Sequence, residues 1–149
     1  MNPLNIISVL NSLKLNYNIS KNTWFGSGGK TKFYFEPKNV TELVFFLKIL
    51  PKKIIIFIIG LGSNTLIRDG GFNGIIIKLN KGFNKIDYNK DKKIIIVGCG
   101  VKNIDLSKFA LNNKIKGFEF LIGIPGSIGG SLKMNASCYE QAIGDLFLS

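Results

Sequence analysis

Apolar residues repeat with a helical period near the start of the chain and alternate with polar residues shortly after it. Four apolar side chains at intervals of three residues predict an amphipathic helix over residues 3–13. Polar and apolar side chains then alternate over residues 32–36, up to Pro37, which predicts a short strand. The helical positions are Leu4, Ile7, Leu10 and Leu13.

Capping residues mark a second helix. Asn39 is followed three positions later by Glu42, an arrangement in which both side chains satisfy free N–H groups at a helix start. Apolar residues follow on one face, and Pro51 ends the segment, so we expect a helix between Asn39 and Pro51. The apolar positions are Leu43, Phe46, Leu47 and Leu50.

Runs of β-branched residues predict strands through the middle of the chain. Residues 53–59 have the isoleucine content and the length of a buried strand. Asn89, Lys90 and Asp91 separate two further runs, which predicts a hairpin. The other expected strands are residues 65–67, 75–79, 85–88 and 92–97, and the other expected helices are residues 103–111 and 129–136.

These elements follow one another without the regular strand–helix alternation of a doubly wound fold, so we expect an α+β fold with one irregular sheet and two main helices. The 149 residues, 46% of them hydrophobic, suffice for one domain with a proper core. No apolar run approaches the ~20 residues of a membrane span, and the N-terminus does not have the order of a signal peptide. We therefore expect a soluble, cytoplasmic protein with no membrane partner.

The net charge of +11 does not by itself indicate a nucleic-acid partner. Arg68 is the sole arginine, and the lysines are spread along the chain instead of forming a stripe with interleaved aromatic side chains. Frequent Lys, Asn and Ile together are typical of an AT-rich genome. We therefore expect no nucleic-acid partner, and a basic field that helps to collect anionic substrates.

The histidine and cysteine content removes several kinds of active site. The chain has no histidine, which excludes Ser-His and Cys-His nucleophile pairs and histidine metal sites. Cys99 and Cys138 lie far apart without metal-ligand spacing, so we expect two reduced thiols and no metal. Any chemistry has to come from a bound cofactor or from residues outside this chain.

Two glycine-rich loops carry the candidate chemistry. Residues 60–64 read Gly-Leu-Gly-Ser-Asn, and residues 123–130 read Gly-Ile-Pro-Gly-Ser-Ile-Gly-Gly. Glycine permits positive φ and close approach, so main-chain N–H groups can converge on a phosphate. Two such loops predict a ligand with two phosphates, such as a dinucleotide cofactor. At Gly62 we expect the backbone to approach a phosphate too closely for a side chain.

Three other interpretations of these loops are weaker. A Rossmann loop needs a third glycine where Thr65 stands, and the turn at Asp69 leaves no room for its crossover helix. A P-loop ending at residues 29–31 would need its first glycine where Trp24 stands, and no strand precedes it. Tight turns without a ligand explain a single such loop better than two.

Several segments together resemble the UDP-N-acetylenolpyruvoylglucosamine reductase family. The match keeps one order and spans nearly the whole chain from Lys21 onward. The segments are residues 22–25 (Asn-Thr-Trp-Phe), 35–37 (Phe-Glu-Pro), 60–74 (GLGSNTLIRDGGFNG), 117–130 (GFEFLIGIPGSIGG) and 134–136 (Met-Asn-Ala).

The resemblance implies an FAD-binding domain of the p-cresol methylhydroxylase and vanillyl-alcohol oxidase type, in truncated form. It implies a reductase of peptidoglycan synthesis, in which NADPH reduces FAD and a UDP-sugar receives the hydride to give UDP-N-acetylmuramate. It places the pyrophosphate on the first loop, and the flavin with its phosphates on the second. The implied cofactor-binding residues are Gly60, Leu61, Gly62, Ser63, Asn64, Thr65, Ile124, Pro125, Gly126, Ser127, Gly129, Gly130, Asn135 and Ala136.

The chain also departs from the family pattern. Gly26 and Ser27 stand where the family has Arg-Val, and Ser137 and Glu140 each stand where it has glycine. The family's Tyr-Arg substrate motif, proton-donating serine and catalytic glutamate fall beyond the matched segment, so no residue here is assigned as catalytic. We expect an N-terminal helix over residues 1–20 and an incomplete FAD-binding domain over residues 21–149, without the substrate-binding domain.

Two alternatives stay open. One is a flavin- or nucleotide-binding remnant without activity, and the other is a related FAD oxidase module. The sequence leaves the oligomeric state open as well.

Overall fold

The structure is a computed structural model that describes residues 3–148. The chain forms two compact units, Met1–Phe83 and Asn84–Ser149. The expected division at residue 20 does not coincide with this boundary. Both units combine helices with strands, as the predicted α+β class requires. Within the described residues, no helix is long and apolar enough to span a membrane.

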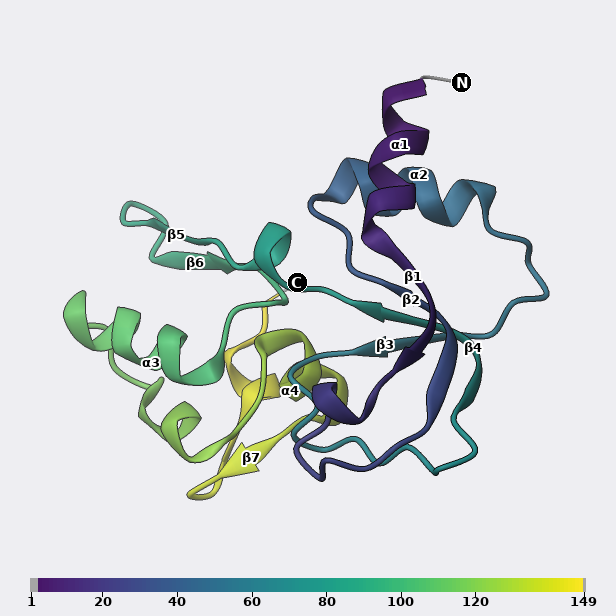
Figure 1. Cartoon of the computed structure of the whole chain (residues 1–149). Coiled ribbons are helices and arrows are strands. Elements are labelled where there is room, and N and C mark those ends of the chain that lie inside the picture. The colour runs from purple at the N-terminus through teal and green to yellow at the C-terminus, as the bar shows by residue number, and fades with distance from the viewer. Residues whose placement is uncertain (1–2, 149) are drawn as a thin grey trace. The chain divides into compact units, whose positions relative to one another are not determined.

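The first unit is built on a four-stranded sheet. Its elements are α1 (Pro3–Ser12), β1 (Leu13–Asn18), β2 (Lys30–Phe35), α2 (Val40–Ile49), β3 (Ile56–Ile59) and β4 (Phe72–Lys78). The strand order is β1-β2-β4-β3 (Figure 1). β1 is antiparallel to β2, whereas β2 and β3 both run parallel to β4. The chain from β2 to β3 therefore crosses over through α2, as parallel pairing demands.

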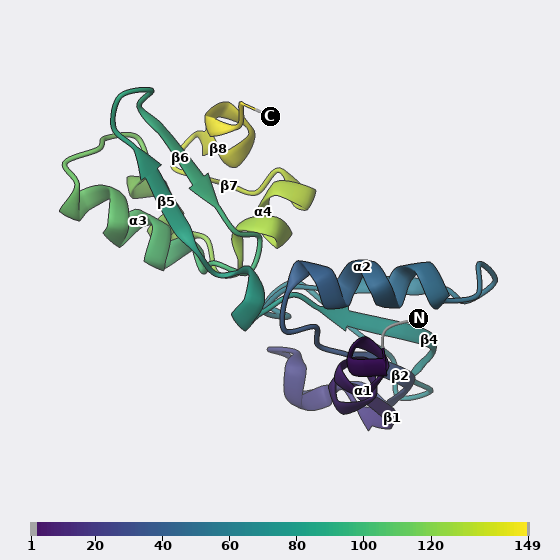
Figure 2. The ribbon, with the colours of Figure 1, turned by 90° about the horizontal axis from the view of Figure 1, so that it is seen from above.

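Both helices of the first unit cover one face of this sheet. Val9 of α1 and Phe46 of α2 are buried there against Ile75 and Ile77 of β4. The ring of Phe46 stacks on that of Phe35 with 4.0 Å between centroids. In Figure 2, α2 runs along β4. This face is closed by apolar helix side chains.

Loops, not helices, cover the opposite face. Ile76 is fully buried there with Ile19, Tyr34 and Ile59. Because successive strand residues point to opposite faces, the isoleucine run of β4 serves both cores. Ile19 and Ile59 each precede a loop, so this face fixes where the loops after β1 and after β3 begin.

The expectation of a buried strand over residues 53–59 is wrong in its length and its burial. It begins at Ile56 and lies at the edge of the sheet, where Ile55 and Ile58 are 64% and 62% exposed. Residues 65–67, also expected as a strand, form none. Isoleucine content correctly indicated a strand, but the position of that strand in the sheet is decided by its single partner, β4.

α1 turns a different face inward from the one expected. Ile7 and Leu10 are 55% and 63% exposed, whereas Val9 is 4% exposed. The helix ends at Ser12, and Leu13 already belongs to β1. The side chain of Leu4 lies outside the described residues. The pairing of Leu13 with Phe35 in the sheet therefore ends the helix, and the packing of Val9 against the sheet sets which face of the helix is buried.

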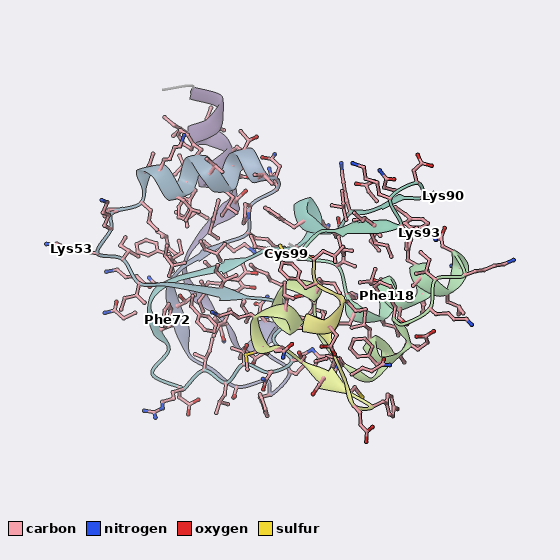
Figure 3. All side chains as sticks on the ribbon, turned by 180° about the vertical axis from the view of Figure 1, so that it is seen from behind. Lys53, Phe72, Lys90, Lys93, Cys99 and Phe118 are labelled. Atoms are coloured by element: carbon pink, nitrogen blue, oxygen red, sulfur yellow. The ribbon has the colours of Figure 1, made fainter. Side chains whose placement is uncertain are left out.

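The second unit has its own core. Its elements are β5 (Ile86–Asn89), β6 (Ile94–Val97), α3 (Asn103–Asn112), α4 (Ile128–Met134), β7 (Ser137–Cys138) and β8 (Gln141–Ala142). β5 pairs with β6 and β7 with β8, both antiparallel. Lys90 and Lys93 mark the turn of the first hairpin (Figure 3). Leu106, Phe120 and Leu121 are buried at the centre of this unit.

Local predictions are confirmed at several places. Asn39 caps α2, since its Oδ1 accepts a hydrogen bond from the Glu42 N–H at 2.8 Å. The hairpin forms around Asn89, whose Oδ1 accepts from the Lys92 N–H at 2.9 Å. Helices α3 and α4 begin within one residue of their expected starts. The expectation of one irregular sheet is wrong, because the described residues form three separate sheets.

Candidate cofactor site

The first glycine loop, residues 60–64, follows the carboxyl end of β3. Ile59 pairs with Lys78 and Phe35 with Ile77, so the carboxyl ends of the parallel strands β3, β4 and β2 lie side by side. Ligands of open sheets bind outside the carboxyl ends of parallel strands. The loop therefore stands where this topology favours a ligand.

Gly62 is held against the chain's own backbone. Its φ is +74°, and a Cβ at this position would clash with the carbonyl oxygen of Asn22. The carbonyl of Gly62 accepts a hydrogen bond from the N–H of Trp24 at 2.9 Å. Contact with the loop after β1 is thus sufficient to require glycine here, and the close approach of a phosphate to Gly62 stays a prediction.

This loop after β1, residues 20–29, is fixed by its own hydrogen bonds. Thr23 Oγ1 donates to the carbonyl of Ser27 at 2.9 Å and lies 3.1 Å from that of Ser20. The N–H of Gly29 donates to the carbonyl of Arg68 at 3.1 Å. Together with the bond between Trp24 and Gly62, this bond holds the loop after β1 against the chain that follows β3.

Side-chain hydrogen bonds anchor this element to the sheet. Asn22 Nδ2 donates to Tyr34 Oη at 3.3 Å, and Tyr34 donates to Glu36 Oε2 at 3.2 Å. Asn80 Nδ2 donates to Glu36 Oε1 at 2.9 Å. Burial, and then the charge of Glu36, raises the pKa of Tyr34 far above its ordinary value. Tyr34 is therefore a neutral phenol that keeps its donor for Glu36.

Two buried polar atoms of the loop after β1 have no hydrogen-bond partner. They are Oδ1 of Asn22 and Oγ of Ser27. Such atoms are rare, because an unpaired buried polar group costs free energy. Between them, Trp24 and Phe25 are 65% and 63% exposed. A cofactor with hydroxyl groups and aromatic rings fits this combination of unpaired oxygens and exposed rings.

The second glycine loop, residues 123–130, leads into α4. Ser127 caps this helix, its Oγ accepting from the N–H of Gly130 at 3.4 Å. The N–H of Gly129 donates to the carbonyl of Cys99 at 2.9 Å, and a Cβ on Gly129 would lie 2.7 Å from that of Cys99. Gly129 thus serves the packing of α4 against the chain at Cys99, a residue labelled in Figure 3.

Asn103, which the sequence interpretation did not single out, holds the second loop. It is fully buried at the start of α3. Its Nδ2 donates to the carbonyl of Ile124 at 2.9 Å and to Ser131 Oγ at 2.7 Å, and its N–H donates to the carbonyl of Gly126 at 3.1 Å. Asparagine at a helix start is typical of a cap, so no local pattern indicated this inward role.

Asn135 and Ala136 form the end of α4. Asn135 has the left-handed C-cap conformation, φ +46°, and its Oδ1 accepts from the Gly144 N–H at 3.1 Å. The N–H of Ala136 donates to the carbonyl of Ser131 at 2.9 Å, and the carbonyl of Ala136 accepts from the Ile143 N–H at 3.0 Å. These contacts fold the segment; its contact with flavin stays a prediction.

The predicted cofactor residues thus fall into two groups, residues 60–65 in the first unit and residues 124–136 in the second. Within the described residues, no group of three His, Cys, Asp or Glu side chains is placed to hold a metal. Burial raises the pKa of the Cys99 thiol, which disfavours the thiolate form that a nucleophile needs. Hydroxyls, carboxamides and main-chain amides dominate both groups, and such groups bind and orient a cofactor.

Known proteins are similar to this chain over most of its length. Residues 31–147 match the family model described as an FAD binding domain. The UDP-N-acetylenolpyruvoylglucosamine reductase of Pelagibacter ubique (strain HTCC1062) is 46% identical over 141 residues, which are 95% of this chain and 46% of the relative. The reductase of the same name from Rickettsia typhi (strain ATCC VR-144 / Wilmington) is 44% identical over 91% of this chain and 45% of the relative.

A solved structure shares the fold. The crystal structure of UDP-N-acetylenolpyruvylglucosamine reductase from Thermus caldophilus has a TM-score of 0.72 and 27% sequence identity, covering 89% of this chain and 45% of that one. This chain spans about half the length of the curated relatives it matches. Since the family model covers most of its residues, the chain belongs to the FAD binding domain family.

Proposed function

We propose that this chain is the FAD-binding part of a UDP-N-acetylenolpyruvoylglucosamine reductase. The observation that carries the proposal is 46% identity along 95% of the chain with a relative of that name. In this reaction NADPH is the reductant, and the enolpyruvyl group of a UDP-sugar is reduced to give UDP-N-acetylmuramate. A cytoplasmic location fits that role in the synthesis of cell-wall precursors.

Cofactor binding is divided between the two glycine loops. We assign the pyrophosphate to residues 60–65, where main-chain N–H groups and the exposed carboxamide of Asn64 supply donors. We assign the flavin and its adjoining phosphate to residues 124–130, with Asn135 and Ala136 beside it. At Gly130, a Cβ would meet only Ser127 Oγ, at 3.5 Å, which leaves an open approach for a ligand. When bound, FAD supplies hydride transfer.

Substrate binding and protonation are assigned to parts of the relatives that this chain does not match. Reduction of an enolpyruvyl group builds negative charge beside the carboxylate, so it requires a positioned acid and groups that stabilise the charge. No residue of either glycine loop is assigned the acid role. On this assignment the chain's own residues bind and orient the cofactor.

Retention of flavin tests the proposal. We expect the chain, mixed with FAD and then dialysed, to keep a protein-bound flavin absorption band. The band should persist at high salt, because attraction by dispersed lysines alone is screened there. Loss of all flavin on dialysis, together with no saturable response to FAD well above micromolar concentration, would overturn the proposal.

A further inference from the structure

We propose that an open hollow in the first unit is a phosphate-binding site. The hollow has a volume of about 340 Å³ and lies where β2 and β4 begin. This volume is within the range of sites for small molecules. The hollow includes none of the residues assigned to the cofactor, so the inference is independent of the proposed function.

The residues that line the hollow are of kinds that bind anions. Lys30 and Lys32 supply two ammonium groups, and Asn16 and Asn73 supply two carboxamides. Lysine binds phosphate as a point charge, and a carboxamide adds N–H donors. No carboxylate lines the hollow, and neither lysine forms an ion pair with a described residue. Two positive charges without a counter-charge therefore border the same open space.

Strands β1 and β2 bring three of these residues together. Lys30 and Lys32 are alternate residues of β2, and Thr31 between them is fully buried, so both lysines leave the strand on its exposed side. Asn16 lies on the neighbouring strand β1, between the two residues that pair with Thr31 and Phe33. The carboxamide is thus placed beside the lysines by strand pairing.

The pairing of β2 with β4 is irregular at the hollow. Phe72 pairs with Thr31, but the register shifts before the next pair, at Phe33. Thr31 Oγ1 donates to the carbonyl of Phe33 at 2.9 Å and lies 3.3 Å from that of Gly74, which fixes the irregularity from its buried side. Bulges redirect side chains and are frequent at binding sites. Asn73, in the shifted stretch of β4, is exposed and lines the hollow.

A turn held by glycine borders the hollow. A Cβ on Gly71 would clash with the carbonyl oxygen of Lys30, so this turn lies directly against the start of β2. The N–H of Gly71 donates to the carbonyl of Arg68 at 2.8 Å. Gly70 lines the hollow, and a Cβ there would meet nothing within 4 Å. A ligand can therefore approach the main chain at this turn.

Charge favours phosphate over other anions. A phosphate monoester carries about −1.5 to −2 charges at pH 7, which two ammonium groups match, whereas a carboxylate carries a single charge. Phe72, labelled in Figure 3, adds an apolar wall for the carbon skeleton of an ester. Free phosphate and a small phosphorylated molecule share the chemistry that the lysines recognise.

Backbone amide chemical shifts of the isotope-labelled chain test the proposal. Inorganic phosphate and glycerol phosphate are titrated separately, with the ionic strength held constant by sodium chloride. We expect saturable shifts in the millimolar range, confined to residues 16, 30–32 and 70–73. Tighter binding of glycerol phosphate would identify a phosphorylated molecule as the ligand, and tighter binding of inorganic phosphate would identify the free ion. No saturation, or shifts spread over the lysines of both units, would overturn the proposal.

Paired lysine variants give a second measurement. The double variant Lys30→Gln with Lys32→Gln should weaken phosphate binding by about tenfold or more, because it removes both charged donors. The matched control is Lys52→Gln with Lys53→Gln, which removes the same charge from exposed positions of the same unit outside the hollow. Lys53 is labelled in Figure 3. We expect the control to change phosphate binding by less than about twofold.

Equal losses in the two double variants would overturn the proposal, because the binding would then depend on net charge alone. The same result would follow if a short single-stranded DNA shifted the lysines of both units and inorganic phosphate did not. Retention of FAD on dialysis is expected to be the same in both double variants and in the original chain. Failure of the phosphate titration with FAD retained would therefore overturn this inference and leave the proposed function standing.

Discussion

Tyr34 joins the sheet to the loop after β1. Its side chain is 1% exposed, its hydroxyl accepts from Asn22, and it donates to Glu36. A phenol in this position is held neutral by burial and by the neighbouring carboxylate. One residue of β2 therefore couples the core of the first unit to the loop that carries Trp24.

Stability at high pH should report this coupling. Tyrosines of the unfolded chain ionise near pH 10, whereas Tyr34 in the folded chain keeps its proton because its pKa is raised. The stabilisation that Tyr34 gives the folded chain is therefore complete below about pH 10. It is lost as the pH rises, since the unfolded state then binds fewer protons than the folded state. We expect the free energy of unfolding of the original chain to fall by about 1.4 kcal/mol per pH unit more than that of Tyr34→Phe above about pH 10.

Urea unfolding at about pH 9 and about pH 11 measures this difference. Ionisation of lysines and of the other tyrosines is common to both proteins and cancels in the comparison. Equal pH dependence in the two proteins would show that Tyr34 ionises normally in the folded chain.

At the level of elements, the loop after β1 and the loop after β3 stabilise each other. Gly62 in the loop after β3 lies against the carbonyl of Asn22, and its own carbonyl accepts a hydrogen bond from the N–H of Trp24. The same arrangement recurs at the base of the loop, where a Cβ on Gly29 would clash with the carbonyl of Asp69. Glycine is required at these positions by contact between loops, whether or not a ligand is bound.

Gly62→Ala should therefore destabilise the first unit. The new Cβ meets the Asn22 carbonyl, and a φ of +74° is strained for alanine, so we expect a loss of about 1–3 kcal/mol in the free energy of unfolding. Chemical denaturation measures it. Gly70→Ala is the control, because a Cβ there meets nothing within 4 Å, and its cost should stay within about 0.5 kcal/mol. Equal stability of the two variants would contradict the assigned contact.

For the whole chain, we expect cofactor binding without complete catalysis. The FAD binding domain match covers residues 31–147, and the reductases that resemble this chain are about twice its length. Both candidate loops lie inside the matched range, whereas no acid or substrate-binding motif is assigned within it. We expect this chain to bind the cofactor without completing the reaction.

We therefore expect the FAD-loaded chain not to reduce UDP-N-acetylenolpyruvoylglucosamine at a useful rate. Absence of a positioned general acid alone costs about 10²–10⁴ in rate, and absence of the substrate-binding surface adds to that cost. NADPH consumption measured with and without the substrate tests this. Substrate-dependent turnover near ordinary enzyme rates would show that the chain itself contains the catalytic residues.

The sequence by itself determined the local features of this protein. The cap at Asn39, the hairpin turn at Asn89, and the helices α3 and α4 depend on residues a few positions apart, so their patterns were sufficient. The ordered set of segments that resemble the reductase family, which includes both glycine loops, also sufficed to indicate the FAD binding domain family.

Only the tertiary structure decided what depends on contacts between distant residues. The edge position of β3, the contact of Gly62 with Asn22, and the inward turn of Asn103 each involve partners tens of residues away or a choice between sheet neighbours. Hydrophobic pattern and glycine content are the same whether an isoleucine strand is central or at an edge, and whether a glycine faces a phosphate or a carbonyl. The physical reason is that packing selects among arrangements that local sequence leaves equal in energy.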